Sequence, residues 1–131
     1  MLPAKTVQIK NRTKGTVIGT RVAMADTMWT RLIGLLRETG LDPGTGLLIR
    51  PSSAVHTLGM KFAIDVVALD PSDKVVGLWP GLIPNRMSGL SFKARAMLEL
   101  PTGTIRQSQI ELNDQLAVED LAVEPEPRAA V

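Results

Sequence analysis

Polar and apolar residues alternate along the first part of the chain, and this alternation predicts a β-hairpin. Val7 and Ile9 share one parity, and the residues between and beyond them are polar, as in a strand with one buried face. Gly15 interrupts the pattern before apolar residues return over 16–23. We therefore expect two paired strands within residues 6–23.

After Asp26 the apolar spacing changes to the helical period. Asp26 is a good N-cap, and the following residues form an apolar stripe at a spacing of about 3.6, which consists of Met28, Trp29, Leu32, Ile33, Leu35 and Leu36. The pattern predicts one amphipathic helix over about 27–38.

The remainder of the chain has the pattern of short strands separated by turns. Turn residues fill 41–46, and Pro71-Ser72-Asp73 predicts a tight turn. Pro101-Thr102-Gly103 opens a short helix or turn, and residues 80–92 form the longest expected loop. The expected strands are 47–50, 54–58, 64–69, 74–79, 94–100 and 115–121.

Together these elements predict an α+β fold, mainly an antiparallel, barrel-like β-sheet with the helix at about 27–38 packed against it. The length of 131 residues suits one compact domain, which we place at 1–123. The tail 124–131, which includes Glu-Pro-Glu-Pro, is expected to be disordered. Only four aromatic residues are present, so the core must be aliphatic.

Composition excludes several kinds of site. The chain has no cysteine, hence no disulfide or thiolate nucleophile, and its one histidine cannot form a histidine metal site. We expect no metal and no cofactor. No apolar run approaches the roughly 18 residues of a membrane span, and the start carries no signal-peptide core. We expect a cytoplasmic protein, or an exported one if a leader was removed.

Charge is unevenly distributed along the chain, although the net charge is only +2. Residues 1–61 carry nine Lys/Arg against three Asp/Glu, whereas residues 62–131 carry six against ten. We expect the fold to bring the two halves together and cancel most of this field; the alternative is an anionic partner. Lys10, Arg12 and Lys14 could follow a phosphate backbone, but few aromatics are present to stack on bases. We interpret them as a solvated edge strand and expect no nucleic-acid partner.

The only histidine lies in Val55–Asp70, an apolar, strand-like segment. In an extended chain His56, Leu58 and Met60 share one face. A histidine among apolar neighbours can be structural, contact a ligand or act as a general base, and the structural role is the simplest interpretation. Ser52 and Ser53, just before it, have no nucleophile motif and are interpreted as turn residues.

Other polar residues could join His56. Asp65 lies in a largely buried strand, so it needs a partner such as Arg86, Arg31 or His56. Glu99 points away from its leucine neighbours, either to the surface or into the same polar cluster. Arg86 lies on the long loop, where it is either solvated or an anion-binding group. Asp70 precedes Pro71 and is most simply a turn residue.

Several linked blocks in the chain resemble the domain-of-unknown-function family numbered 192. They are Trp29–Leu36, Gly46–Ile49, Pro51, Val55–Thr57, Met60, Phe62, Ile64–Val67, Leu69–Asp70, Val75–Val76, Pro84, Arg86, Leu98–Pro101 and Gly103. The resemblance covers about residues 16–121. It implies a small, mostly β fold and a cluster of polar positions, with no established activity.

The chain departs locally from this family's pattern. Leu58 and Gly59 stand where the family usually has aromatics, and Ala63 where it usually has proline. Asn113-Asp114 replaces a usual Gly-Asp. The missing aromatics could reshape the surface around His56.

Two hypotheses of function follow. The first is a non-enzymatic domain that binds a small or extended ligand, or serves as an accessory domain, with a polar cleft around the 55–65 segment and the 80–92 loop. Its candidate ligand contacts are His56, Asp65, Arg86 and Glu99. The second is an enzyme that uses His56 as general base, oriented by Asp65 or Glu99. An open pocket in which His56 meets a carboxylate would support both.

Overall fold

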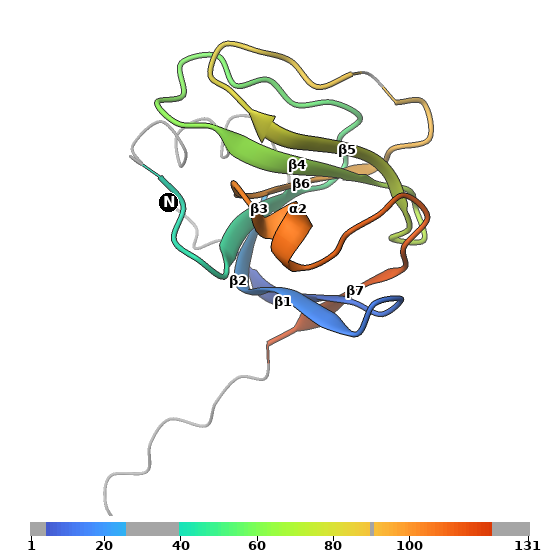
Figure 1. The fold of residues 1–131 in the computed structure, drawn as a ribbon. Coiled ribbons are helices and arrows are strands. Elements are labelled where there is room, and N and C mark those ends of the chain that lie inside the picture. The colour runs from blue at the N-terminus through green and yellow to red at the C-terminus, as the bar shows by residue number, and fades with distance from the viewer. Residues whose placement is uncertain (1–4, 26–39, 90, 122–131) are drawn as a thin grey trace, which may run out of the picture.

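The structure, a computed structural model, describes residues 5–25, 40–89 and 91–121, which form a curled sheet of seven strands (Figure 1). In spatial order the strands are β5 (Val75–Leu82), β4 (Ile64–Leu69), β6 (Ala96–Pro101), β3 (Thr45–Ile49), β2 (Thr16–Ala25), β1 (Thr6–Asn11) and β7 (Leu116–Asp120). The sheet is curled into a half-barrel. Its edge strands β5 and β7 approach each other at one point, where Lys74, just before β5, forms a bridge with Gln115, just before β7. Backbone hydrogen bonds from Val75 N to Asp114 O (2.9 Å) and from Leu116 N to Asp73 O (3.0 Å) reinforce that junction.

Strand pairing confirms most of the sequence prediction and corrects three parts of it. The predicted hairpin is β1 and β2, and the turn after β4 lies where Pro71-Ser72-Asp73 predicted it. The sheet is not wholly antiparallel, because β2 and β3 pair in parallel. The predicted strand at 54–58 is wrong, since only His56 forms an isolated bridge, with Met87. Strand β1 is not an edge strand, because it lies between β2 and β7.

One short helix, α2 (Thr104–Gln107), lies inside the curl of the sheet (Figure 1). It begins directly after Gly103, as the Pro-Thr-Gly sequence predicted, and its Ile105 packs in the core. The amphipathic helix predicted at about 27–38 and the tail 124–131 both lie outside the described residues. Within the described ranges, no helix has the length and hydropathy required to cross a membrane.

Strands β4 and β6 are buried on both faces, which explains why every residue of β4 except Asp65 is apolar, with no alternation. The inner face, with Val67, Leu98 and Ile105, forms the core of the curl. The outer face forms a second core in which Val66 and Met97 pack against Val55 and other residues of the connecting segments. Successive residues of β4 therefore point into two different cores.

Ion pairs between the two ends of the chain offset part of its uneven charge. Three lysines at or near β1 meet carboxylates from near β7: Lys5 with Asp120 at 2.9 Å, Lys10 with Glu119 at 3.2 Å, and Lys14 with Glu111 at 2.6 Å and Asp114 at 3.0 Å. The basic half and the acidic half of the sequence thus share one end of the sheet.

Asp114 is the buried member of this group. Asn11 Nδ2 and Glu111 N donate to its Oδ2 at 2.9 and 3.0 Å, and Lys14 Nζ contacts both carboxylate oxygens. Burial by itself raises the pKa of Asp114, but these hydrogen bonds outweigh it, so the pKa lies below its ordinary value. The hydrogen bond to Glu111, followed by that to Asp114, raises the pKa of Lys14. Asn113 has a φ of 74°, which asparagine tolerates as glycine does.

Candidate functional site

Two connecting segments cover the outer face of β4 and β6 and carry two of the four predicted site residues. We call residues 51–63 together with 83–89 and 91–95 the loop pair. The two segments run antiparallel across the side of β4, β5 and β6 that is remote from α2 (Figure 1). Their backbones are joined by hydrogen bonds from Thr57 N to Arg86 O (2.8 Å) and from Ser88 N to Val55 O (2.9 Å).

Buried side chains fix the loop pair in place. Thr57 is fully buried; its hydroxyl lies 2.7 Å from the Ile83 carbonyl oxygen and accepts a hydrogen bond from Arg86 N at 2.8 Å. Ser88 is also buried, and its hydroxyl accepts a hydrogen bond from Val55 N at 2.9 Å. Because these groups satisfy loop backbone atoms that no regular ladder reaches, the loops are held without becoming strands.

Two of the four predicted site residues lie on the loop pair. His56 is half-buried and stands opposite the exposed Met87. Arg86 is exposed, and its Nη1 donates to the carbonyl oxygen of Asn85 at 3.2 Å. The chain neighbours of His56, Val55 and Thr57, are buried, and the Nδ1 atom of His56 is buried as well.

Asp65 is fully buried and serves the backbone. In the pairing of β4 with β5, Ile64 opposes Leu82 and Val66 opposes Trp79, which leaves an extra residue on β5 opposite Asp65. Gly81 takes a left-handed φ of 64° in this bulge, and its N–H donates to Asp65 Oδ1 at 2.8 Å. Asp65 Oδ2 accepts the N–H of Ile105, in the first turn of α2, at 2.9 Å. One carboxylate thus joins a bulge to a helix start.

Glu99 is fully buried, so the surface alternative for this residue is wrong. It lies directly opposite Val66 on β4 and Leu47 on β3, both of which belong to the outer core. Its side chain therefore points to the same face of the sheet that the loop pair covers. Gly46 allows a close approach here, because a Cβ at that position would lie 2.6 Å from the Glu99 carbonyl oxygen.

The four predicted residues do not share one side of the sheet. His56, Arg86 and Glu99 belong to the outer side, whereas Asp65 faces α2 on the inner side. In an enzyme in which Asp65 orients His56, the two side chains would have to be in contact, but β4 lies between them. The hypothesis of an enzyme in which Glu99 orients His56 stays a prediction.

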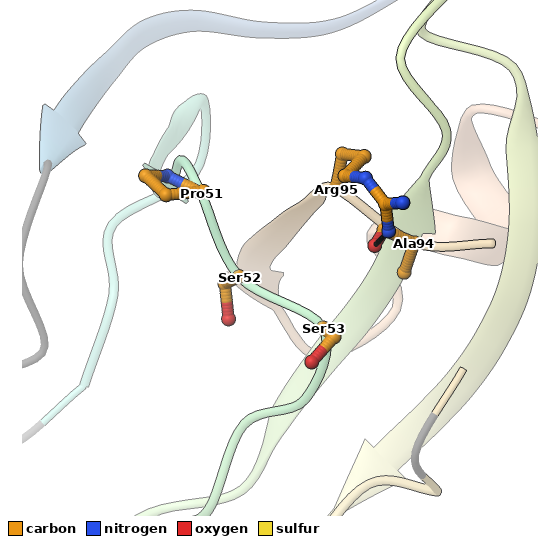
Figure 2. Close-up of a pocket in the computed structure, with 5 residues that line it drawn as sticks. All are labelled: Pro51, Ser52, Ser53, Ala94 and Arg95. Carbon is orange, nitrogen blue, oxygen red and sulfur yellow. Dashed lines mark hydrogen bonds between the residues drawn. The ribbon is translucent and has the colours of Figure 1, made fainter. Parts of the chain in front are cut away.

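A pocket at one end of the loop pair contains residues that the sequence analysis did not select. It has a volume of about 310 Å³ and is lined by Pro51, Ser52, Ser53, Ala94 and Arg95. Figure 2 shows Ser52 and Ser53 on one of the two segments and Arg95 on the other. Ser52 N donates to Arg95 O at 2.9 Å, which brings the two segments together. This pairing is tertiary, so a motif search could not find it.

The charge of the loop pair is entirely positive. Residues 51–63 and 83–95 contain no aspartate or glutamate, and their four cations are Lys61, Arg86, Lys93 and Arg95. All four are exposed, and none forms an ion pair with a carboxylate in the described part of the chain. Across the described ranges, no three His, Asp or Glu side chains cluster as metal ligands would. The surface is therefore suited to an anion.

Comparisons with known proteins agree with the fold. A UPF0127 protein of Thermococcus sibiricus is 30% identical over 128 residues, which covers 91% of this chain and 77% of the relative. A UPF0127 protein of Pyrococcus furiosus is 32% identical over 117 residues, covering 81% of this chain and 93% of the relative.

Two solved structures have the same fold. One, from Sinorhizobium meliloti 1021, is described as a candidate transcription regulator; its TM-score is 0.74 at 16% identity, over 90% of this chain and 97% of that chain. The other, a protein of unknown function from Novosphingobium aromaticivorans, has a TM-score of 0.72 at 18% identity, over 89% and 93%.

The family profile confirms the resemblance seen in the sequence. It matches residues 8–118, which include every strand except the first residues of β1 and the last residues of β7. No specific activity is established for the family or for these relatives. The chain belongs to DUF192, a family of uncharacterised proteins.

Proposed function

We propose that this protein is a non-enzymatic binding domain that holds an anionic group of its ligand at the loop pair. The observation that carries the proposal is the pocket between Pro51 and Arg95, which combines two serines with an arginine. Hydroxyl and guanidinium donors are the groups that bind phosphate and carboxylate oxygens in proteins. No carboxylate is found among the described residues that line this pocket.

Arg95 is well suited to this role. Its Nη1 donates to the carbonyl oxygens of Phe92 at 3.2 Å and Ala94 at 3.0 Å, which orients the guanidinium plane. Among the described residues no other contact engages the guanidinium, so its remaining N–H donors are available to an oxyanion. Ser52 is oriented as well, because its hydroxyl donates its single hydrogen to the Ala54 carbonyl oxygen at 2.9 Å; the hydroxyl donor to an oxyanion is therefore that of Ser53.

The predicted site residues take two different roles in this proposal. His56 and Arg86 contact the parts of the ligand that extend beyond the pocket along the loop pair. Asp65 and Glu99 lie beneath and act through the positions of the strands and loops. A neutral or protonated His56 donates one or two hydrogen bonds, so it also favours an anionic or polar ligand.

An NMR titration with inorganic phosphate tests the pocket. We expect saturable shifts of the backbone amides of Ser52, Ser53 and Arg95. A charge-assisted hydrogen bond contributes about 1.5–3 kcal/mol, so Arg95→Gln should weaken binding about 10- to 100-fold. Arg106→Gln removes an equally exposed arginine on α2 and should leave the affinity unchanged.

A thermal-shift screen of anionic metabolites against the wild type and His56→Ala tests the wider site. Hits that stabilise the wild type and lose that effect in the variant support the proposal. The proposal fails if phosphate, sulfate and acetate all produce no saturable shifts, or if every hit is indifferent to both Arg95 and His56.

A further inference from the structure

Large apolar side chains project into solvent from the same loop pair. Leu58 is 58% exposed, Ile83 49%, Met87 70% and Phe92 88%. A side chain that lines a groove is usually at least half-buried by its walls, so Met87 and Phe92 project outward. Four such residues on one surface exceed the scattered single exposures that a folded protein normally shows.

These residues lie close together although they are distant in sequence. The bridge between His56 and Met87 brings the two segments into register, and Gly59 N lies 3.3 Å from Asn85 Oδ1 near Leu58. The hydroxyl of Thr57 reaches the carbonyl oxygen of Ile83. At the other end of the loop pair, Ser91 N donates to Ser53 O next to Phe92. These contacts place all four residues along the same loop pair.

Cations accompany the apolar residues directly. Arg86 precedes Met87, Lys93 follows Phe92, and both cations are exposed. Figure 1 shows the loop pair at one end of the molecule, while β7, with Glu119 and Asp120, lies at the opposite end. An anionic surface would attract the loop-pair end, whereas Glu119 and Asp120 at the β7 end are paired with Lys10 and Lys5, so the charges favour docking through the loop pair.

We propose that the loop pair docks on an anionic lipid bilayer, with Met87 and Phe92 inserted below the headgroups and the cations among the lipid phosphates. The assignment of a headgroup phosphate to the Ser52–Arg95 pocket rests on the proposed function. A bilayer interface accepts projecting apolar side chains without a matched pocket for each. An acidic protein would need a complementary cavity for every one, and this difference favours the membrane.

Vesicle co-sedimentation of the full chain tests the proposal. We expect binding to vesicles of phosphatidylcholine with phosphatidylglycerol, weaker binding to pure phosphatidylcholine, and loss of binding as salt is raised. Because a buried aromatic side chain contributes about one order of magnitude or more to partitioning, Phe92→Ser should reduce binding at least about tenfold. Lys93→Glu should reduce it by a similar factor through charge reversal.

Two matched variants test whether vesicle binding depends on the loop pair or is non-specific binding by any exposed apolar or charged residue. Leu112→Ser removes an apolar side chain that is 57% exposed in the turn before β7, and Arg106→Glu reverses an exposed charge on α2. Both should bind vesicles as the wild type does. The circular-dichroism spectrum of each variant verifies that it is folded.

Several outcomes overturn the inference. They are no preference for anionic vesicles, binding that Phe92→Ser leaves unchanged, and an oligoglutamate peptide that binds the same surface more tightly than the vesicles do. Phosphate shifts at Ser52 and Arg95 without vesicle binding retain the proposed function and reject the membrane. Vesicle binding without any phosphate shift supports the membrane and rejects the anion pocket.

Discussion

Asp65 provides the sharpest test of how this fold is held together. Its two oxygens accept the N–H of Gly81 at 2.8 Å and of Ile105 at 2.9 Å, and the side chain is fully buried. Asp65→Ala removes both acceptors at once. Each of the two donors then loses its partner, one in the bulge of β5 and one at the start of α2.

The expected size of the effect follows from these contacts. A buried donor without a partner costs about 1–3 kcal/mol. The Ile105 N–H is buried and should incur the full amount, whereas water can reach the Gly81 N–H in part. We expect Asp65→Ala to lower the free energy of unfolding by about 2–4 kcal/mol. Asp65→Asn keeps one acceptor but turns an amide donor toward the other N–H, so about 1–3 kcal/mol should be lost.

Asp70 offers a matched control within the same chain. Its Oδ1 also accepts two backbone N–H groups, from Ser72 at 2.8 Å and Lys74 at 2.9 Å, but in an exposed turn. Water can replace these bonds, so Asp70→Ala should lose less than about 1 kcal/mol. The two variants therefore remove the same number of hydrogen bonds and differ in burial.

Urea unfolding followed by circular dichroism measures all three variants. A domain of this size is usually stable by about 5–15 kcal/mol, so the variants should remain folded without urea. Hydrogen exchange should show faster exchange at the Gly81 and Ile105 amides in Asp65→Ala. The reasoning is refuted if Asp65→Ala loses no more stability than Asp70→Ala, or if those two amides keep their protection.

Three further perturbations test other parts of the structure. The pKa of Asp114 is lowered in the folded state, so its contribution to stability is present above its ordinary pKa of about 4 and is lost as pH falls through the folded-state pKa. In urea unfolding measured against pH, Asp114→Asn should therefore reduce the loss of stability at acidic pH, which we call the acid limb. Gly77→Ala would place a Cβ 2.7 Å from the Trp79 ring, so overpacking should cost about 1–3 kcal/mol in urea unfolding. Thr57→Val keeps the shape but removes the hydroxyl that serves Arg86 N, so about 1–3 kcal/mol should be lost and hydrogen exchange of residues 83–89 should accelerate.

Each of these variants has a control of the same chemistry. Glu119→Gln removes a more exposed carboxylate and should keep the acid limb. Gly89→Ala adds a Cβ at an ordinary 3.5 Å from the same tryptophan ring. Thr45→Val removes an exposed hydroxyl that donates to the Asp42 carbonyl oxygen at 2.6 Å. If a control variant loses as much stability as the variant it is paired with, burial or close packing does not cause the loss of stability.

The local elements were predictable because their causes are local. Alternation around Val7 and Ile9 predicted β1, and the mostly apolar run of 64–69 predicted a largely buried strand, which is β4. Pro71-Ser72-Asp73 predicted its turn, with Asp70 as the residue that caps it. The 54–58 strand was predicted wrongly because His56 and its neighbours have a strand pattern but meet a loop instead of a sheet.

The partners of buried polar groups were not predictable in the same way. Sequence alone indicated that Asp65 needs a partner and suggested charged side chains, whereas its observed partners are the backbone N–H groups of Gly81 and Ile105. Every residue except proline carries such an N–H, so composition gives no signal for which one is left over by a bulge or a helix start. Likewise, nothing in the sequence joins Ser52 to Arg95.

The sequence by itself determined the family, the strands, the turns and the need to satisfy a few buried polar residues, because periodicity and turn chemistry act over neighbouring positions. The tertiary structure decided which face each polar residue occupies. A one-residue step along β4 or β6 moves a side chain through the sheet, so Asp65 faces α2 while Glu99 faces the loop pair. Strand pairing also placed the acidic residues of β7 on the basic hairpin, and it left the cations of the loop pair without a described carboxylate partner.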